Sequence, residues 1–128
     1  MYHVLVLLDG DDMLISTLER VLRRYNYKAG SATKIEDGVK YVKKHKPDIA
    51  FVNMYLPVMG SVEAVRRIKE ADPKIKVILF SDGNTCRSVK EARKLGISSC
   101  LDMPFALKDL KKALKKAEKE IEEEKESA

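Results

Sequence analysis

The sequence predicts an α/β fold in which helices cover both faces of a parallel sheet. Short, nearly unbroken apolar runs alternate along the chain with longer segments whose apolar residues recur at helical spacing. Strands of a parallel sheet read as continuous apolar runs because both of their faces are buried. Their alternation with helical segments is the pattern of consecutive βαβ units.

Five segments are predicted as strands. The first, Val4–Leu8, is too short for a helix and has no polar face. A less apolar segment, residues 27–31, is predicted as the second strand. The other three predicted strands are residues 49–52, 75–80 and 97–101.

Five segments between and after these strands are predicted as helices. Asp11 or Asp12 is suited to cap the first helix, Pro73 follows the end of the third, and Gly96 suits the end of the fourth. Their apolar stripes lie within residues 14–22, 35–44, 62–72, 88–96 and 107–121.

Length and composition predict one domain. The chain has 128 residues, of which 45% are apolar and 35% charged, so it is neither a disordered chain nor a collagen-like fibre. The longest apolar run is far short of the roughly 20 residues that a membrane span needs, and no signal peptide opens the chain. We expect one domain over residues 1–128, with 118–128 as a charged extension of the last helix or the start of a linker.

The cysteines and the charge bear on compartment and partners. Cys86 and Cys100 are too few for a disulfide scaffold, which favours a reducing, cytoplasmic location. The net charge of +5 is spread over several segments with little aromatic interleaving. This distribution indicates a solvated surface. Direct nucleic-acid binding is not favoured, because the sequence has no helix-turn-helix pattern.

His3 and His45 lack the spacing of metal ligands and are predicted to be ordinary surface residues.

Polar residues gather where the predicted strands end. Asp9 follows the first strand, Asn53 the third, Ser81 the fourth and Met103 the fifth. In an open parallel sheet, ligands bind beyond the carboxyl ends of the strands. The candidate pocket therefore consists of Asn53 together with Asp9, Gly10, Asp11, Ser81, Met103 and Pro104.

Over roughly residues 2–120 the chain resembles the receiver domain of bacterial two-component response regulators. The resemblance is carried by pieces that follow one another in order: residues 4–9, 46–49, Asn53 with Pro57, residues 77–81, Ala92 with Gly96, and residues 103–105. It implies a CheY-like, flavodoxin-like (βα)5 sandwich with strand order 2-1-3-4-5. It also implies a pocket in which two acids and an aspartate bind Mg²⁺, the aspartate accepts a phosphoryl group, and a lysine and a hydroxyl hold that group.

This sequence departs from the family pattern at those positions. Asn53 stands at the phosphoacceptor position, Gly10 replaces one of the paired acids, and Met103 replaces the lysine. An amide is a poor nucleophile and forms no acyl phosphate. If only the lysine were lost, the remaining carboxylates would repel one another. If only the acids were lost, the lysine ammonium would be unpaired. Loss of both avoids these two penalties. We therefore interpret the chain as a degenerate receiver, without catalytic residues and without a cofactor, in which Asp9 and Asp11 offer at most a weak Mg²⁺ site.

The resemblance implies a protein partner on the face formed by the fourth helix, the fifth strand and the fifth helix. Candidate contact residues there are Lys90, Arg93, Lys94, Cys100, Lys108, Lys111 and Lys112. The stripe Leu107, Leu110, Leu114, Ala117 and Ile121 fits the core face of the last helix, and beyond Ala117 it also fits a homodimer seam or a link to a C-terminal output domain.

The hypothesis that follows is a pseudo-receiver signalling module that binds proteins without being phosphorylated and is not an enzyme. Two alternatives stay open. One is a conventional phosphorelay receiver that is phosphorylated at a neighbouring acid such as Asp11. The other is a flavodoxin-like domain that binds a small molecule, although only the lone Gly10 and Gly83 resemble a phosphate-binding glycine loop.

Overall fold

The computed structural model describes residues 1–8, 12–53, 58–82, 94, 96–103 and 105–127. Strands and helices alternate over most of the chain. The strands are β1 (His3–Leu8), β2 (Lys28–Ala32), β3 (Ile49–Asn53), β4 (Lys76–Asp82) and β5 (Ser99–Met103). The helices are α1 (Asp12–Arg24), α2 (Ile35–His45), α3 (Val58–Ala71) and α6 (Leu107–Ser127).

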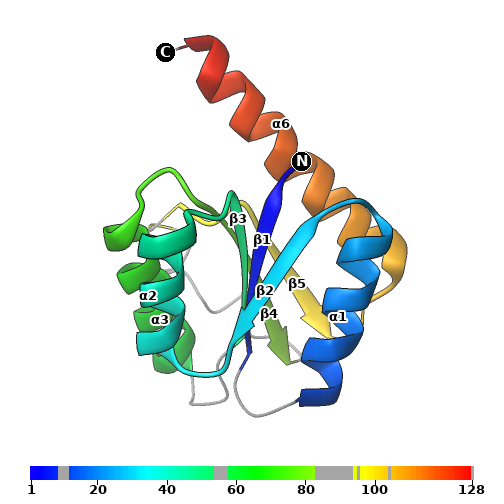
Figure 1. The fold of residues 1–128 in the computed structure, drawn as a ribbon, viewed down its shortest axis with the longest axis vertical. Helices are drawn as coiled ribbons and strands as arrows, with labels where there is room; N and C mark the ends of the chain where they lie inside the picture. Colours follow the sequence, from blue (N-terminus) through cyan, green and yellow to red (C-terminus); the bar gives the residue numbers. More distant parts are fainter. Residues whose placement is uncertain (9–11, 54–57, 83–93, 95, 104, 128) are drawn as a thin grey trace.

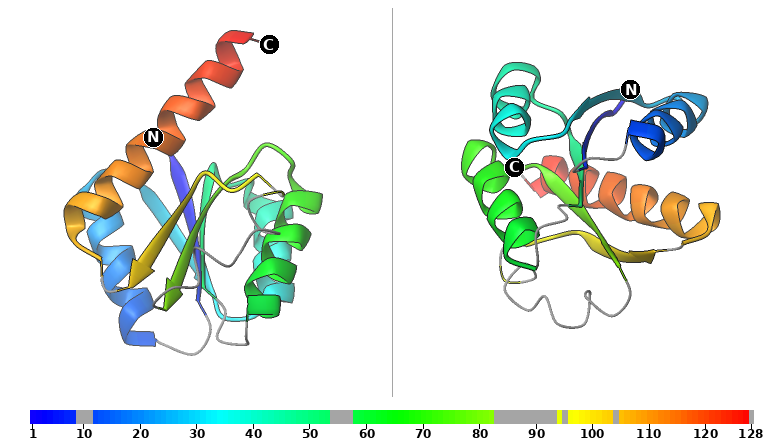
Figure 2. Two further views of the ribbon diagram at one scale, coloured as in Figure 1. Left: turned by 180° about the vertical axis from the view of Figure 1, so that it is seen from behind. Right: turned by 90° about the horizontal axis from the view of Figure 1, so that it is seen from below.

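The strands form one parallel sheet of order β2-β1-β3-β4-β5, which confirms the predicted fold (Figure 1). Helices α1 and α6 cover one face, and α2 and α3 cover the other, as the view from below shows (Figure 2). Every strand ends at the same edge of the sheet because all run in one direction. That edge is called the carboxyl edge below, and the opposite one the amino edge.

The side chains of β1 show why its sequence is apolar throughout. Val4, Val6 and Leu8 pack into the core beneath α1 and α6. Leu5 and Leu7 point to the other face and pack beneath α2 and α3. All five are at most 2% exposed, so a polar residue at any of them would be buried in one of the two cores.

Some boundaries differ from the predicted ones. The fifth strand begins at Ser99, two residues later than expected, because the Ser98 amide donates to the Val77 carbonyl at 2.8 Å as the chain enters the sheet. Leu107 was expected in the core face of the last helix, but its side chain is 55% exposed. It is the first residue of α6 and lies beyond the sheet that Leu110 and Leu114 cover. The predicted helix within residues 88–96 falls almost entirely outside the described residues.

Helix α6 continues past the body of the domain and crosses the amino edge of the sheet (Figure 1). Four glutamates at every second position of this helix accept hydrogen bonds from side chains at the starts of four strands or in the loops that precede them. The Tyr27 hydroxyl donates to Glu118 at 2.6 Å and the Tyr2 hydroxyl to Glu122 at 2.5 Å. On the other side of the helix, Ser98 donates to Glu120 and Lys76 to Glu124.

Two apolar residues of the same segment are buried between these glutamates. Ala117 is fully buried and Ile121 is 9% exposed, both within the core of this chain. The stripe beyond Ala117 is therefore intramolecular, and it is not available as the homodimer seam that its spacing also fitted. We call residues 118–127 the α6 tail below.

Candidate functional site

The carboxyl edge brings together most of the strand ends that the sequence predicted to form a pocket. Leu8 of β1 lies beside Asn53 of β3 in the sheet register. On the next pair, Ser81 lies beside Asp102, and Asp82 beside Met103. The described positions of the predicted pocket thus lie at the ends of neighbouring strands, with Asn53 half-buried at the end of β3.

A stack of three phenylalanines lies behind this edge. Phe51 and Phe80 are both buried, and their ring centroids are 4.9 Å apart in a stacked arrangement. Phe105, just before α6, continues the stack at 4.8 Å from Phe80. The stack connects the ends of β3 and β4 to the start of α6 through rigid apolar contacts. The sequence identified Phe105 only as part of a family motif, because its stacking partners lie on other strands.

Several residues of the predicted pocket fall outside the described residues: Asp9, Gly10, Asp11 and Pro104. Ser81 and Met103 are placed by their strands, β4 and β5, at the carboxyl edge. The Asn53 side chain is a neutral amide, which donates and accepts hydrogen bonds.

Cys100 differs from its expected state. The sequence, with too few cysteines for a disulfide scaffold, predicted Cys100 as a contact residue of the partner face in a reducing location. The side chain is half-buried against the core beneath α2 and α3, and it is disulfide-bonded. It therefore offers no free thiol on the predicted partner face. Cys86 lies outside the described residues.

The predicted partner face contains a shallow groove beside β5 and the start of α6. Its volume is about 320 Å³, and its lining includes Cys100, Asp102, Phe105 and Lys112. Of the predicted contact residues on this face, Lys94, Lys108, Lys111 and Lys112 are exposed, and the Lys111 ammonium lies 4.6 Å from the ring centroid of Tyr25. Lys90 and Arg93 lie outside the described residues. β5 is also the last strand of the sheet, so one of its edges is not paired within the sheet.

The amino edge holds a cluster that the sequence did not predict. His3 Nε2 and the Tyr41 hydroxyl share a hydrogen bond, and the His3 ring lies 6.2 Å from that of His45. Tyr41 lies over Gly30 of β2, where a Cβ would collide with its ring. The two histidines thus belong to one cluster, in which His3 is half-buried and His45 is exposed, as predicted. Their separation in the sequence hid this, because parallel pairing and α2 bring them together.

This cluster predicts a specific loss of stability in acid. Burial, the Lys28 ammonium and His45 lower the pKa of His3 below its ordinary value of 6.5. Since the unfolded chain then takes up the proton more readily, His3 stabilises the fold above about pH 6.5, and this stabilisation is lost as the pH falls towards the lowered pKa. We expect His3→Gln to reduce the difference in free energy of unfolding between pH 7.5 and pH 5.5.

Urea unfolding of the original chain and of the His3→Gln variant at the two pH values measures that difference. Subtracting the difference found for the variant from that of the original chain removes the contribution of the carboxylates, which both proteins share. The His3 ring protons, followed by NMR, should titrate below pH 6.5. An equal pH dependence in the two proteins would contradict the assignment to His3.

Within the described part of the chain, no group of three or more His, Cys, Asp or Glu side chains is arranged to hold a metal ion. No helix in the same part is both long enough and apolar enough to cross a bilayer.

Comparisons with known proteins agree with the fold and the motifs. The family model described as response regulator receiver domain matches residues 5–115. Protein CcdB of Bacillus subtilis is 35% identical over 106 residues, which are 82% of this chain and 88% of that protein. The chemotaxis protein CheY of Thermotoga maritima is 29% identical over 101 residues, which are 78% of this chain and 84% of CheY.

A solved structure shows the same architecture. The response regulator receiver domain protein from Clostridium thermocellum matches with a TM-score of 0.82 at 19% identity, and the match covers 100% of both chains. At this identity the likeness supports the fold alone.

Proposed function

This chain belongs to the response regulator receiver family, and on that premise we propose that it signals through protein contacts without being phosphorylated at the end of β3. The observation that carries the proposal is Asn53. It stands beside the end of β1, at the phosphoacceptor position implied by the family resemblance, and has an amide in place of the carboxylate. Acyl phosphate formation needs a carboxylate oxygen as nucleophile, and this position supplies none.

The neighbouring substitutions support the same proposal. Gly10 leaves Asp9 without its paired acid, and Met103 offers no ammonium to phosphoryl oxygens. Loss of the lysine alone would leave three carboxylates close together without a cation, and loss of the acids alone would leave the ammonium unpaired. The combination avoids both penalties, which is what a pocket no longer used for phosphoryl transfer would show. Mg²⁺, which favours sites with carboxylate oxygens, is not part of the proposed mechanism.

The proposed contact surface is the exposed side of β5 and the first half of α6. It combines the groove of about 320 Å³ with exposed ammonium groups on Lys108, Lys111 and Lys112. Leu107, 55% exposed, adds an apolar contact at the start of the same helix. A lysine-rich rim around an apolar contact suits a protein partner with an acidic surface.

Treatment with acetyl phosphate and Mg²⁺, followed by intact-mass measurement under mild conditions, tests the proposal. We expect no gain of about 80 Da, the mass of one phosphoryl group. A receiver with an aspartate at the phosphoacceptor position, treated in parallel, is the positive control.

The other outcomes separate the alternatives. A stoichiometric gain that maps to Asp11 or another acid near the carboxyl edge would overturn the proposal in favour of a conventional phosphorelay receiver. Absence of a gain, together with loss of binding to an isolated partner on Lys108→Glu and Lys112→Glu substitution, would support it. The matched control for those variants is Lys40→Glu, which makes the same charge change at an exposed position of α2.

A further inference from the structure

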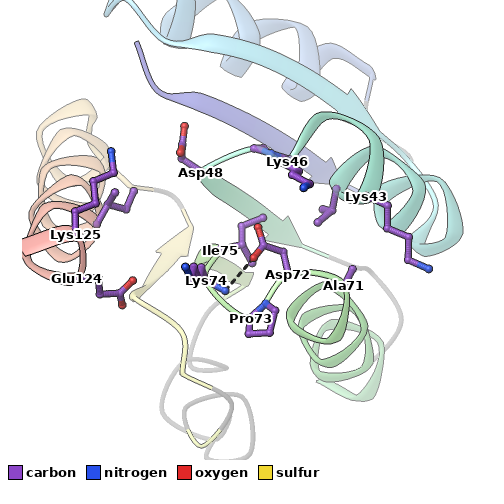
Figure 3. A pocket seen from close by; sticks show the side chains of 13 residues that line it. Lys43, Lys46, Asp48, Ala71, Asp72, Pro73, Lys74, Ile75, Glu124 and Lys125 are labelled. Carbon is purple, nitrogen blue, oxygen red and sulfur yellow. Dashed lines mark hydrogen bonds between the residues drawn. The ribbon is translucent and has the colours of Figure 1, made fainter. Parts of the chain in front are cut away.

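A cavity of about 890 Å³ lies at the amino edge of the sheet, at the opposite end from Asn53 (Figure 3). Three segments enclose it: the turn between α2 and β3, the turn between α3 and β4, and the end of the α6 tail. Ligand pockets in proteins usually have volumes of roughly 300–1,000 Å³. The cavity is thus large enough for a small molecule, and it is separate from the carboxyl edge.

Apolar and charged side chains both line the cavity. Val42, Ile75 and Pro47 are buried behind its wall. The apolar surface that a ligand could contact belongs to Ala71, which is half-buried, to the exposed Pro73, and to Ile121 of the α6 tail, which is 9% exposed. An apolar ring or chain placed here would be removed from water on several sides.

The acidic side chains around the cavity already have partners within the protein. An Asp48 carboxylate oxygen accepts the His3 amide hydrogen at 2.9 Å, and one from Asp72 accepts the Lys74 amide hydrogen at 3.0 Å. Glu124 pairs with the Lys76 ammonium, whose side chain is only 11% exposed. Lys76 thus balances the charge of Glu124, whereas Asp48 and Asp72 accept from neutral amides and keep their negative charges.

Three lysines of the rim carry no ion pair within the described residues: Lys43, Lys46 and Lys74. A fourth, Lys125, lies 3.8 Å from Glu122, at the outer limit of an ion pair. In Figure 3 the lysines extend from all three segments that enclose the cavity. An anion at the rim would gain charge-assisted contacts that the protein itself does not supply.

The backbone of Lys46 adds an independent observation. Its φ of 47° and ψ of 59° are left-handed, a conformation that is unfavourable for a residue with a Cβ. The Lys46 amide closes the end of α2 on the Val42 carbonyl at 2.9 Å, a position where glycine is the usual residue. Strained backbone of this kind is concentrated at binding sites. A lysine thus occupies a glycine-favoured position at the rim of a cavity whose three lysines outside ion pairs outnumber its two carboxylates outside ion pairs, Asp48 and Asp72, within the described residues.

We propose that this cavity binds a small organic anion, with its apolar body against Ala71, Pro73 and Ile121 and its acidic group between the Lys46 and Lys74 ammonium groups. Such a ligand would contact both turns and the α6 tail together. Its binding would therefore favour the docked tail over the undocked one. The proposal does not depend on the chemistry at Asn53.

The test uses 8-anilinonaphthalene-1-sulfonate, an aromatic anion whose fluorescence rises in apolar surroundings. We expect saturable binding of one molecule to the folded protein, weakened roughly tenfold by Lys46→Gln combined with Lys74→Gln. N-phenyl-1-naphthylamine, which has nearly the same rings but no charge, should bind more weakly and equally to both proteins. The matched control is Lys40→Gln combined with Lys108→Gln, two exposed lysines outside the cavity.

NMR of the backbone amides locates the bound probe. The largest shifts are expected at residues 46–48, 72–75 and 121–125. The proposal is overturned if no saturable binding occurs, if the Lys46 and Lys74 variants bind the sulfonate as tightly as the control variant, or if the shifts centre elsewhere. Glutamine keeps the left-handed strain at position 46 unchanged, so the variants should fold, and Lys74→Gln alone serves as a second variant.

Discussion

Deletion of residues 118–128 is expected to destabilise the domain by at least about 3 kcal/mol. The deletion removes Ile121, whose burial contributes about 2 kcal/mol on the scale for apolar side chains. It also removes the carboxylates that accept from Tyr27 and Tyr2 and pair with Lys76. The Lys76 ammonium, buried with a side chain only 11% exposed, would be left without its partner.

Smaller variants separate the apolar contribution from the polar one. Ile121→Ala should cost about 2–3 kcal/mol through loss of contacts and the space left in the core. Glu123→Ala and Glu126→Ala change exposed positions of the same helix and should alter stability by no more than about 0.5 kcal/mol. Urea unfolding followed by circular dichroism provides all of these values. If the truncated protein were as stable as the full chain, the tail would be a solvated linker.

Alkaline titration gives a second readout of the docked tail. The hydrogen bond to Glu122 raises the pKa of Tyr2 to about 12, and burial and the bond to Glu118 also raise that of Tyr27. Both tyrosines therefore stabilise the fold below pH 10, the ordinary pKa, and this stabilisation is lost as the pH rises above it. Ultraviolet absorbance should show tyrosine ionisation at lower pH after Glu118→Gln and Glu122→Gln substitution than before.

The sheet was predictable because the apolar pattern that indicates each buried strand lies within one short stretch of the sequence. β1, β3 and β4 each contain an uninterrupted apolar run, residues 4–8, 49–52 and 77–80, as a strand covered on both faces requires, and the core residues of β1 divide between the two faces accordingly. β2 was harder to predict because it is an edge strand with a mixed burial pattern and the sequence KAGSA. The candidate site followed from the topology, since parallel strands place all their carboxyl ends at one edge.

The amino edge was not predictable in the same way. The glutamates of the α6 tail look like a solvated charged face, and their partners Tyr2, Tyr27, Lys76 and Ser98 are separated from them by 22–120 positions in the sequence. The cavity has the same origin, because its lining comes from two turns and a helix end. The hydrophobic periodicity of one segment does not indicate which side chains of two other segments it contacts.

The largest change in chemistry is expected from restoring the receiver pocket. The triple variant Gly10→Asp, Asn53→Asp, Met103→Lys should gain about 80 Da on treatment with acetyl phosphate and Mg²⁺, whereas the original chain should not. The carboxylate introduced at position 53 supplies the nucleophile at the end of β3. The one introduced at position 10, beside Asp9, completes the acidic pair that the family uses to hold Mg²⁺, and the new ammonium neutralises phosphoryl oxygens.

Partial variants show whether the three changes act together. Asn53→Asp alone supplies a nucleophile but neither the paired acid nor the lysine, so its mass gain should be much slower than that of the triple variant. The pair Asn53→Asp with Met103→Lys should need far more Mg²⁺ to react, because Asp9 still lacks its acidic neighbour. If Asn53→Asp alone reacted as fast as the triple variant, the residues Gly10 and Met103 would not contribute to the lack of phosphorylation. If the triple variant folded but gained no mass, the divergence of this pocket would extend beyond these three positions. The rate of mass gain at two Mg²⁺ concentrations decides between these outcomes.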